Sequence, residues 1–292
     1  MTAEIPLTTR PARRPFLKRL SGAAFLLRSV PAMFLLLVLL AAVFADFVAP
    51  YDPNQQDLAN LLEGPSWTHI MGTDSLGRDV FSRMLYGGRI SLLVGVVSVV
   101  VAMVIGVLLG IASAMIGGRL GDAIMRLTDL SLTLPGILIA LAVAATVGPS
   151  LINVILIISL LYWAQFARMA RGEALSIRER DYVQAAYAIG CSPMRILRLH
   201  IFPNLVNTMI VLATLEVAAA ILLESTLSFL GVGVPPPTPT WGIMIAEGRP
   251  YVELGWWSVT FPGLAIMLTV LAVNLLGDTL RDRLDPKFAQ RS

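Results

Sequence analysis

The sequence predicts an all-helical integral membrane protein with about six transmembrane helices. Of its 292 residues, 56% are hydrophobic and only 14% are charged, whereas a soluble domain carries about a quarter charged residues. The charged residues are also separated by long uncharged runs. Because a helix needs about 20 apolar residues to cross a hydrocarbon core about 30 Å thick, these runs locate the membrane spans.

Two features refine the spans near the N-terminus. A basic segment, residues 1–28, precedes the first apolar run, an order that also fits a signal peptide. The length of the run and the lack of a clear small-residue cleavage site favour a retained anchor. In the second span, Gly106 and Gly110 have the small-xxx-small spacing that lets two helices approach closely.

The uncharged run at residues 130–166 is too long for one crossing. Gly148, Pro149 and Ser150 interrupt it and predict a tight hairpin between two spans. A later uncharged run, residues 225–246, contains four prolines that break helices, so it is interpreted as an external or re-entrant loop. The six predicted spans are about 29–48, 90–116, 131–147, 151–167, 205–223 and 256–276.

The distribution of basic residues predicts the orientation. Of the 22 Lys and Arg residues, only Arg78, Arg83, Arg89 and Arg249 fall in segments that lie outside if both termini are inside. This asymmetry follows the positive-inside rule. It makes residues 168–204 a cytoplasmic loop and places external loops at 49–89 and 224–255.

The inventory of reactive residues argues against chemistry on this chain. There are two histidines, His69 and His200, far apart in sequence, and one cysteine, Cys191, so a histidine-based metal site is not expected. Lys18 and Lys287 are the only lysines, and neither follows a glycine as a phosphate-binding loop requires. We therefore expect no metal or cofactor on this chain; if ATP drives the protein, another chain hydrolyses it.

The loop at 168–204 predicts two short helical pieces around a turn at residues 190–193. Gly and Pro mark the turn. The first piece starts at Asp181 and carries small residues, and the second, from Met194 to His200, alternates aliphatic and basic residues. Such a surface can dock in a groove of a partner protein or lie on lipid headgroups.

Residues in this loop resemble the signature of the permease subunits of ABC importers, which reads E-A-A, three residues, G, then a hydrophobic residue and Pro. The matching residues are Gln184, Ala185, Ala186, Gly190 and the pair Phe202-Pro203. Gln184 departs from the usual Glu, and His200 stands where the pattern prefers an aliphatic residue. The resemblance implies that the loop inserts into an ATPase subunit through Asp181, Gln184, Ala185, Ala186, Gly190, Cys191, Ser192, Pro193, Arg195 and Pro203.

Nearly everything after residue 45 is similar to one branch of that family, the C-type subunits of dipeptide, oligopeptide and nickel permeases. The blocks that carry the resemblance are residues 49–54, 71–83, 181–203, 227–242 and 274–286. It implies a type I ABC importer permease fold in the bacterial cytoplasmic membrane. The implied partners are a second permease, two ATPase subunits that bind ATP and magnesium, and a substrate-binding protein, which mainly selects the solute.

Four alternating charges in the first external loop form another candidate site: Asp74, Arg78, Asp79 and Arg83. If this segment is helical, Asp79 and Arg83 form an i,i+4 pair. One interpretation is a docking or gating element under the binding protein. The other is a solvated helix whose surface ion pairs each contribute little.

Two carboxylates fall within or near the fifth span. Glu216 lies inside the span, where a charge is costly, so it either lines the translocation pathway or forms hydrogen bonds at the contact with the second permease. Glu224, near the outer end, is interfacial or lies at the mouth of the pore. Arg168 and Arg171, just inside the fourth span, are interpreted as topology anchors.

Three other classes of protein fit the sequence less well. A secondary transporter usually shows internal repeats with broken helices, and no clear repeat is visible. An intramembrane enzyme needs a nucleophile with a base or a metal set, and the predicted spans contain no histidine. A channel is disfavoured by the blocks that resemble importer permeases.

Overall fold

The computed structural model describes residues 16–284, with side chains described for residues 29–282. Within this part the chain is helical, and its β-structure is limited to an isolated bridge between Thr73 and Asp79. Of the predicted basic segment 1–28, residues 1–15 lie outside the described residues. Residues 16–28 form the start of the first helix. The elements are α1 (Phe16–Val43), α2 (Ala45–Val48), α3 (Val80–Ile116), α4 (Gly118–Thr133), α5 (Gly136–Val147), α6 (Leu151–Arg178), α7 (Asp181–Ala188), α8 (Pro193–Ile196), the π-helix η1 (Leu197–Ile201), α9 (Phe202–Phe229), α10 (Trp241–Gly248), the 3₁₀ helix η2 (Arg249–Tyr251) and α11 (Trp257–Leu284).

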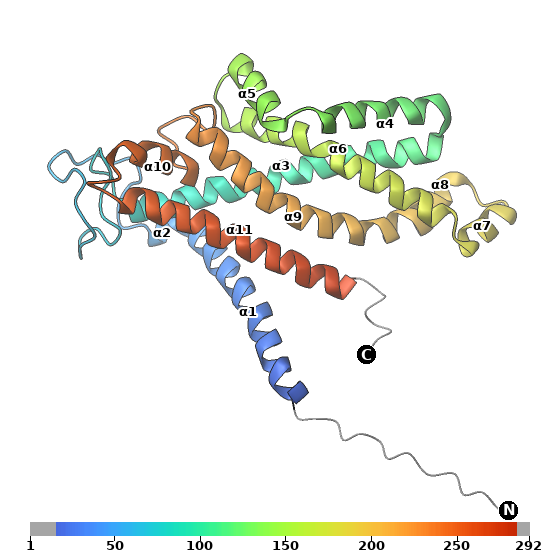
Figure 1. Cartoon of the computed structure of the whole chain (residues 1–292), viewed down its shortest axis with the longest axis horizontal. Helices are drawn as coiled ribbons and strands as arrows, with labels where there is room; N and C mark the ends of the chain where they lie inside the picture. The colour runs from blue at the N-terminus through green and yellow to red at the C-terminus, as the bar shows by residue number, and fades with distance from the viewer. Residues whose placement is uncertain (1–15, 285–292) are drawn as a thin grey trace, which may run out of the picture.

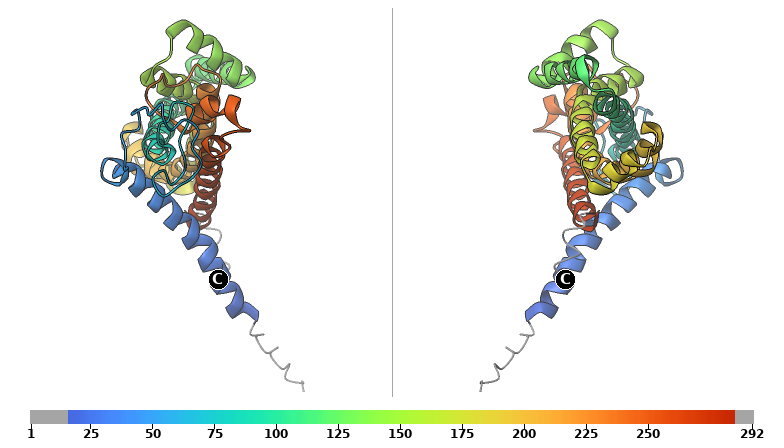
Figure 2. Two further views of the ribbon diagram at one scale, coloured as in Figure 1. Left: turned by 90° about the vertical axis from the view of Figure 1, so that its left-hand side faces the viewer. Right: turned by 90° about the vertical axis from the view of Figure 1, so that its right-hand side faces the viewer.

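Four long helices, α3, α6, α9 and α11, run side by side and form the body of an elongated bundle, while α1 leans outward from it (Figures 1 and 2). The closest packing joins α3 to α6. A side-chain carbon added at Gly106 would overlap the carbonyl oxygen of Trp163, and one added at Gly110 would overlap that of Ala167. The close helix contact predicted from the spacing of these glycines is therefore confirmed.

Four helical stretches of the described residues are long and apolar enough to cross a membrane: Val80–Ile116, Leu151–Arg178, Pro193–Phe229 and Trp257–Asp282. They match the second, fourth, fifth and sixth predicted spans. The α4–α5 pair, bent by 92°, provides a fifth if it crosses as one broken span. The first predicted span corresponds to the shorter apolar helix Ser29–Val43.

The third predicted span, 131–147, is not one straight helix. It is broken at Leu134, whose backbone is extended, and at Pro135. Proline lacks an amide donor and pushes the residue before it out of helical geometry. The remaining helix, α5, has 12 residues and is about 18 Å long at 1.5 Å per residue, too short to cross a hydrocarbon core alone.

The long helices also extend beyond the predicted spans. α3 starts at Val80 rather than residue 90, and α6 continues to Arg178, eleven residues into the predicted 168–204 loop. The predicted external loop at 224–255 contains the end of α9 and the whole of α10. The charge-free runs mark where a helix lies in hydrocarbon, but a helix can continue past a charged residue into water.

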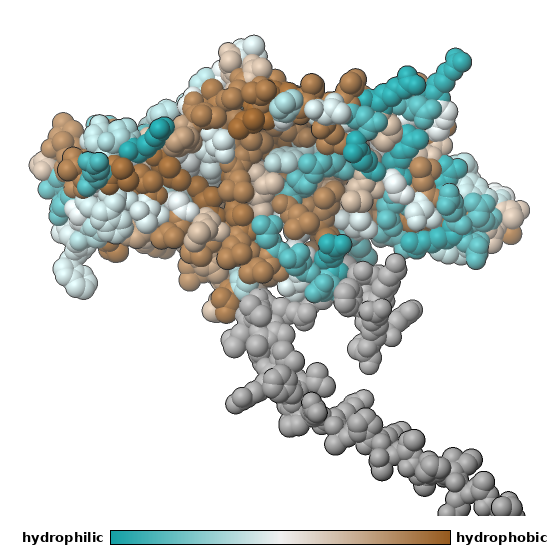
Figure 3. Space-filling model, viewed as in Figure 1, coloured by the Kyte–Doolittle hydropathy of each residue, from teal (hydrophilic) through white to brown (hydrophobic). Residues whose placement is uncertain are grey.

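The surface of the bundle is divided by polarity. Hydrophobic residues cover much of the middle of the face shown in Figure 3, and hydrophilic residues gather toward the end that carries α7 and α8. Large apolar side chains such as Leu108, Leu138 and Leu160 are more than half exposed. A surface of this kind suits lipid chains or the helices of a partner.

Candidate functional site

The turn between α7 and α8 ends one helix and starts the next with side-chain and backbone caps. The Gly190 amide donates to the Tyr187 carbonyl and the Cys191 amide to the Ala186 carbonyl, both at 3.0 Å. This pair of bonds is a Schellman motif, and Gly190 has the left-handed φ of 83° that the motif requires. Ser192 then caps α8, its hydroxyl accepting from the Arg195 amide. The predicted helix–turn–helix is confirmed.

Several contacts hold α7 against the rest of the bundle. Val183 is buried, and the Gln184 side-chain nitrogen donates to the Arg178 carbonyl at the end of α6 over 2.8 Å. The Tyr182 ring meets the His200 ring edge-on at 5.7 Å between centroids, linking α7 to η1. Thus the two residues that depart from the family pattern, Gln184 and His200, both make contacts that position the loop.

The loop lies at one end of the bundle (Figure 1), and several of its apolar side chains are exposed. Ile189 is 81% exposed, and Met194 and Leu199 are each more than half exposed. Exposed apolar groups beside charged ones suit a docking surface. Of the predicted coupling residues, Asp181, Gln184, Ala185, Gly190, Ser192, Pro193, Arg195 and Pro203 are exposed, Ala186 is buried and Cys191 is half-buried. Their role in coupling stays a prediction.

At the opposite end, the charges of the first external loop form a buried network. Arg78 bonds Asp74 and also Glu247 of α10, each at 2.7 Å, and Arg83 bonds Glu247 at 2.8 Å. The side chain of Arg83 is 1% exposed and that of Glu247 is 27% exposed. The interpretation as a solvated helix with surface ion pairs is therefore wrong. Glu247 was not predicted, because its partners are distant in sequence.

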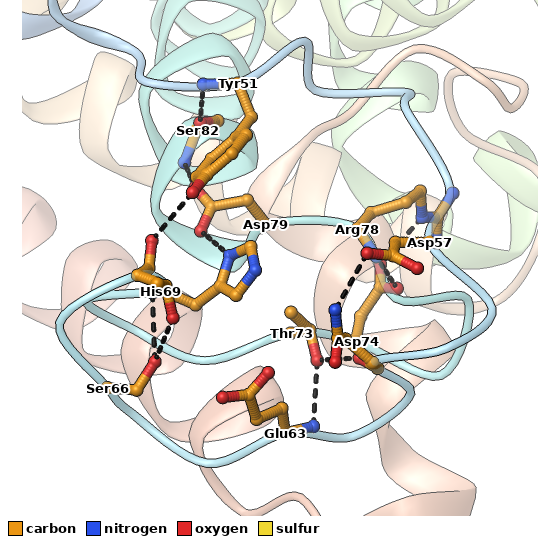
Figure 4. A network of polar contacts seen from close by, with 12 residues as sticks. Tyr51, Asp57, Glu63, Ser66, His69, Thr73, Asp74, Arg78, Asp79 and Ser82 are labelled. Atoms are coloured by element: carbon orange, nitrogen blue, oxygen red, sulfur yellow. Dashed lines mark hydrogen bonds and ion pairs between the residues drawn. The ribbon is translucent and has the colours of Figure 1, made fainter.

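Asp79 has a different role from the one its spacing suggested. Its carboxylate accepts from the Ser82 amide at 2.7 Å and so caps the start of α3, and it contacts His69 Nδ1 at 3.0 Å (Figure 4). The i,i+4 ion pair of this segment is Asp74–Arg78 rather than Asp79–Arg83. Asp79 is thus a helix-capping residue within the folded loop that precedes α3.

This folded loop borders an open pocket of about 440 Å³. Figure 4 shows polar side chains of the loop around it, including Tyr51, Glu63 and His69. The full lining is Tyr51, Gln55, Asp57, Asn60, Glu63, Thr68, His69, Gly77 and Asp79. The predicted docking or gating role of this end of the molecule stays a prediction.

The two carboxylates of α9 lie in different surroundings. Glu224 is 0% exposed; it accepts from the Ser91 hydroxyl at 3.0 Å and from the Ser228 hydroxyl at 2.7 Å. Its carboxylate therefore joins α3 to α9 within the subunit, and the predicted place of Glu224 at an interface or at the mouth of the pore stays a prediction. Glu216 is 8% exposed, and among the described residues no hydrogen bond or ion pair reaches it.

The family follows from the sequence match over the bundle. The profile described as a binding-protein-dependent transport system inner membrane component matches residues 106–290. The chain belongs to this family. A second profile, the N-terminal transmembrane domain of oligopeptide transport permease C, matches residues 32–65. The predicted resemblance to the C-type peptide permeases is thereby confirmed.

Similar permeases cover almost the whole chain. The di/tripeptide transport system permease protein DppC of Pseudomonas aeruginosa is 45% identical over 262 residues, 88% of this chain and 86% of the relative. The dipeptide transport system permease protein DppC of Escherichia coli is 42% identical over 296 residues, 99% of this chain and 97% of the relative. The protein is therefore a permease subunit of an ABC transporter.

A solved structure supports the fold. The inward-facing MetNI methionine ABC transporter superposes with a TM-score of 0.57 at 18% identity, covering 70% of this chain and 96% of that chain. At this identity the match concerns the fold alone. The predicted type I importer permease fold is confirmed, with the long helices of the bundle as its membrane-spanning part.

Proposed function

We propose that this permease forms half of the translocation pathway of an ATP-driven importer for di- or oligopeptides, and that the α7–α8 loop docks on an ATPase subunit. The observation that carries the docking proposal is the loop itself: a capped turn with exposed apolar side chains at one end of the bundle. The peptide class is supported by the names of the relatives, which transport dipeptides or di/tripeptides.

The assembly we propose contains a second, homologous permease, two ATPase subunits and an extracytoplasmic binding protein. ATP and magnesium are held by the ATPase subunits, and this chain hydrolyses nothing itself. We place it in the bacterial inner membrane with both termini cytoplasmic, because most Lys and Arg residues then lie inside. Glu216 is proposed as a pathway residue, since an intramembrane carboxylate that no hydrogen bond or ion pair of the described residues reaches suits a cavity.

Docking is tested by placing a charge on the exposed face of the loop. In the complex reconstituted in liposomes, Ile189→Asp should abolish ATP-dependent dipeptide uptake and binding-protein-stimulated hydrolysis, because it puts a carboxylate in an apolar contact. Leu254→Asp is the matched control: Leu254 is 70% exposed, in the segment between η2 and α11. Unchanged uptake with Ile189→Asp, in an assembled complex, would overturn the docking proposal.

The turn can be tested separately from the surface. Gly190 and Gly148 have similar left-handed φ angles, 83° and 81°, and neither has an atom within 4 Å of an added side-chain carbon. Valine at either position therefore introduces similar backbone strain. We expect Gly190→Val to reduce stimulated ATPase activity and uptake together, and Gly148→Val, in the α5–α6 turn, to leave stimulation intact.

The peptide assignment needs its own measurement. With the cognate binding protein supplied, labelled dipeptide uptake should be inhibited by unlabelled di- or tripeptide and unaffected by nickel ions. Inhibition by nickel ions and not by unlabelled peptide would indicate that the protein belongs to a nickel importer. Uptake that continues without ATP but depends on an ion gradient would instead indicate a secondary transporter.

A further inference from the structure

α4 is attached to the bundle by few buried contacts. Only Gly121 and Thr128 of this 16-residue helix are buried. It follows two glycines with left-handed φ, Gly117 at 62° and Gly118 at 55°, and it ends where the chain becomes extended before Pro135. Both ends of α4 are therefore points where the backbone direction can change, and something else must fix its position.

Two arginines of α6, Arg168 and Arg171, contact α4, and a third, Arg178, ties α6 to the end of α3. Arg178 donates to the Ala114 carbonyl at the end of α3 over 2.5 Å. Arg171 donates to the Ser113 hydroxyl at 2.5 Å and to the Gly121 carbonyl at 2.9 Å. Further along α6, Arg168 bonds Asp129 of α4 at 2.7 Å. We name Arg168, Arg171 and Arg178 the arginine ladder.

Arg171 is the central member of the ladder. Its guanidinium also lies 3.5 Å from Asp122, and its side chain is 23% exposed. It therefore joins the last turn of α3, the first turn of α4 and α6 at one point. A cation at this place is favoured by the negative end of α3. The Arg168–Asp129 pair is well exposed and contributes less.

The ladder stands between the proposed docking loop and the bent span. α6 leads directly into α7, only two residues after Arg178, so a displacement of the loop moves the end of α6. α4 leads into α5 through the break at Pro135. Met125 and Leu132 of α4 also pack against apolar residues of α6.

We infer that Arg171, supported by Arg168 and Arg178, is a positioning residue for transport: it makes α4 move with α6, so that a displacement of the α7–α8 loop reaches the bent α4–α5 span. This inference rests on the proposed docking of the loop. It goes further, because it assigns the transmission step to side chains of α6, two of which, Arg168 and Arg171, were interpreted only as topology anchors. In this inference the backbone bends at the two ends of α4, at Gly117–Gly118 and at Leu134–Pro135, when α4 moves with α6.

The first test measures the coupling ratio, the solute taken up per ATP hydrolysed, in the reconstituted complex. Arg171→Met should lower this ratio roughly 2- to 30-fold, the effect expected for a mutation within a coupling network, while hydrolysis continues. Arg171→Lys, which keeps the charge but loses the forked contact, should lie between. Arg126→Met is the matched control, because Arg126 is an exposed arginine of α4 outside the ladder.

The second test reads the movement directly. Spin-labelled non-canonical residues at Leu127 of α4 and Met169 of α6, both exposed, leave Cys191 in place, and their separation is measured without nucleotide and with trapped ATP. In the otherwise unaltered complex we expect the same distance distribution in both states, and with Arg171→Met a broader or shifted one. If Arg171→Met does not assemble, the exposed pair Asp122→Asn with Asp129→Asn replaces it.

The outcomes separate this inference from the proposed function. A separation that changes with nucleotide in the unaltered complex overturns the inference, and so does an unchanged coupling ratio in Arg171→Met or, where that variant fails to assemble, in the Asp122→Asn, Asp129→Asn pair. If Ile189→Asp abolishes stimulated hydrolysis in the same experiments, the proposed docking stands and only the ladder fails. If Ile189→Asp has no effect, the docking proposal itself has failed.

Discussion

Arg83 and Glu247, which are 164 positions apart in the sequence, meet at 2.8 Å where the start of α3 contacts α10. Arg78 bonds the same Glu247 oxygen at 2.7 Å and Asp74 at 2.7 Å. The two arginines and two carboxylates balance in charge. A single carboxylate of α10 therefore keeps two buried guanidinium groups compensated at one end of the bundle.

Removing this carboxylate should destabilise the permease. We expect Glu247→Ala to cost about 3 kcal/mol, because breaking a buried ion pair leaves an uncompensated charge. The measurement is the thermal unfolding of the purified permease in detergent. Glu253→Ala, at an exposed carboxylate a few residues further on, is the control. Equal melting temperatures for Glu247→Ala and the unaltered protein would contradict this prediction.

The contact between α3 and α6 leaves no room for a side chain at Gly106. A leucine there would overlap the Trp163 carbonyl and the Phe166 side chain, so the two helices would have to separate. We expect Gly106→Leu to cost about 1–3 kcal/mol or more, as overpacking does in other cores. Gly263→Leu is the control, because nothing lies within 4 Å of an added carbon at Gly263. The check is the yield of monodisperse protein and its melting temperature.

Local signals in the sequence were enough to predict the loop and most of the bundle. The turn before α8 depends on Gly190, Ser192 and Pro193, whose backbone preferences act within a few residues. The long helices follow from apolar runs that need no knowledge of their neighbours. The contact of Gly106 with α6 was predictable because small residues four apart suit helix packing in membranes.

Other features depend on contacts that no local pattern records. The Arg83–Glu247 pair closes across 164 residues, and its charges look like surface charges when only their spacing is considered. The bend between α4 and α5 did have a local signal, since Pro135 is followed by Gly136, a pair that interrupts helices. This signal was overlooked because the uncharged run at residues 130–166 was divided only at Gly148, Pro149 and Ser150.

The two glutamates of α9 should respond differently to mutation. Glu224→Ala removes an acceptor that Ser91 and Ser228 share inside the subunit. Each buried hydroxyl left without its partner costs about 1–3 kcal/mol, so this variant should lose thermal stability and expression. Glu216→Gln keeps the size of the side chain and breaks no hydrogen bond or ion pair of the described residues, so it should fold normally.

A transport measurement distinguishes a pathway role of Glu216 from a structural role of Glu224. If Glu216 lines the pathway, Glu216→Gln should change the peptide uptake rate of the reconstituted complex while its melting temperature stays that of the unaltered protein. Ser91→Ala and Ser228→Ala should each reproduce part of the Glu224→Ala loss. A stable Glu224→Ala variant with altered uptake would indicate that Glu224 lines the pathway.

Replacing Gln184 by the glutamate usual in the family should loosen α7 in this chain. The Gln184 side-chain nitrogen donates to the Arg178 carbonyl at 2.8 Å, whereas a carboxylate cannot donate and would repel that oxygen. An ordinary hydrogen bond contributes about 0.5–1.5 kcal/mol, so Gln184→Glu should speed amide exchange in α7 roughly 2- to 12-fold. Gln184→Met removes the donor without adding a charge and should give a similar change, so a difference between the two variants measures the repulsion alone. Unaltered exchange in both would show that Val183 and the Tyr182–His200 contact hold α7 without Gln184.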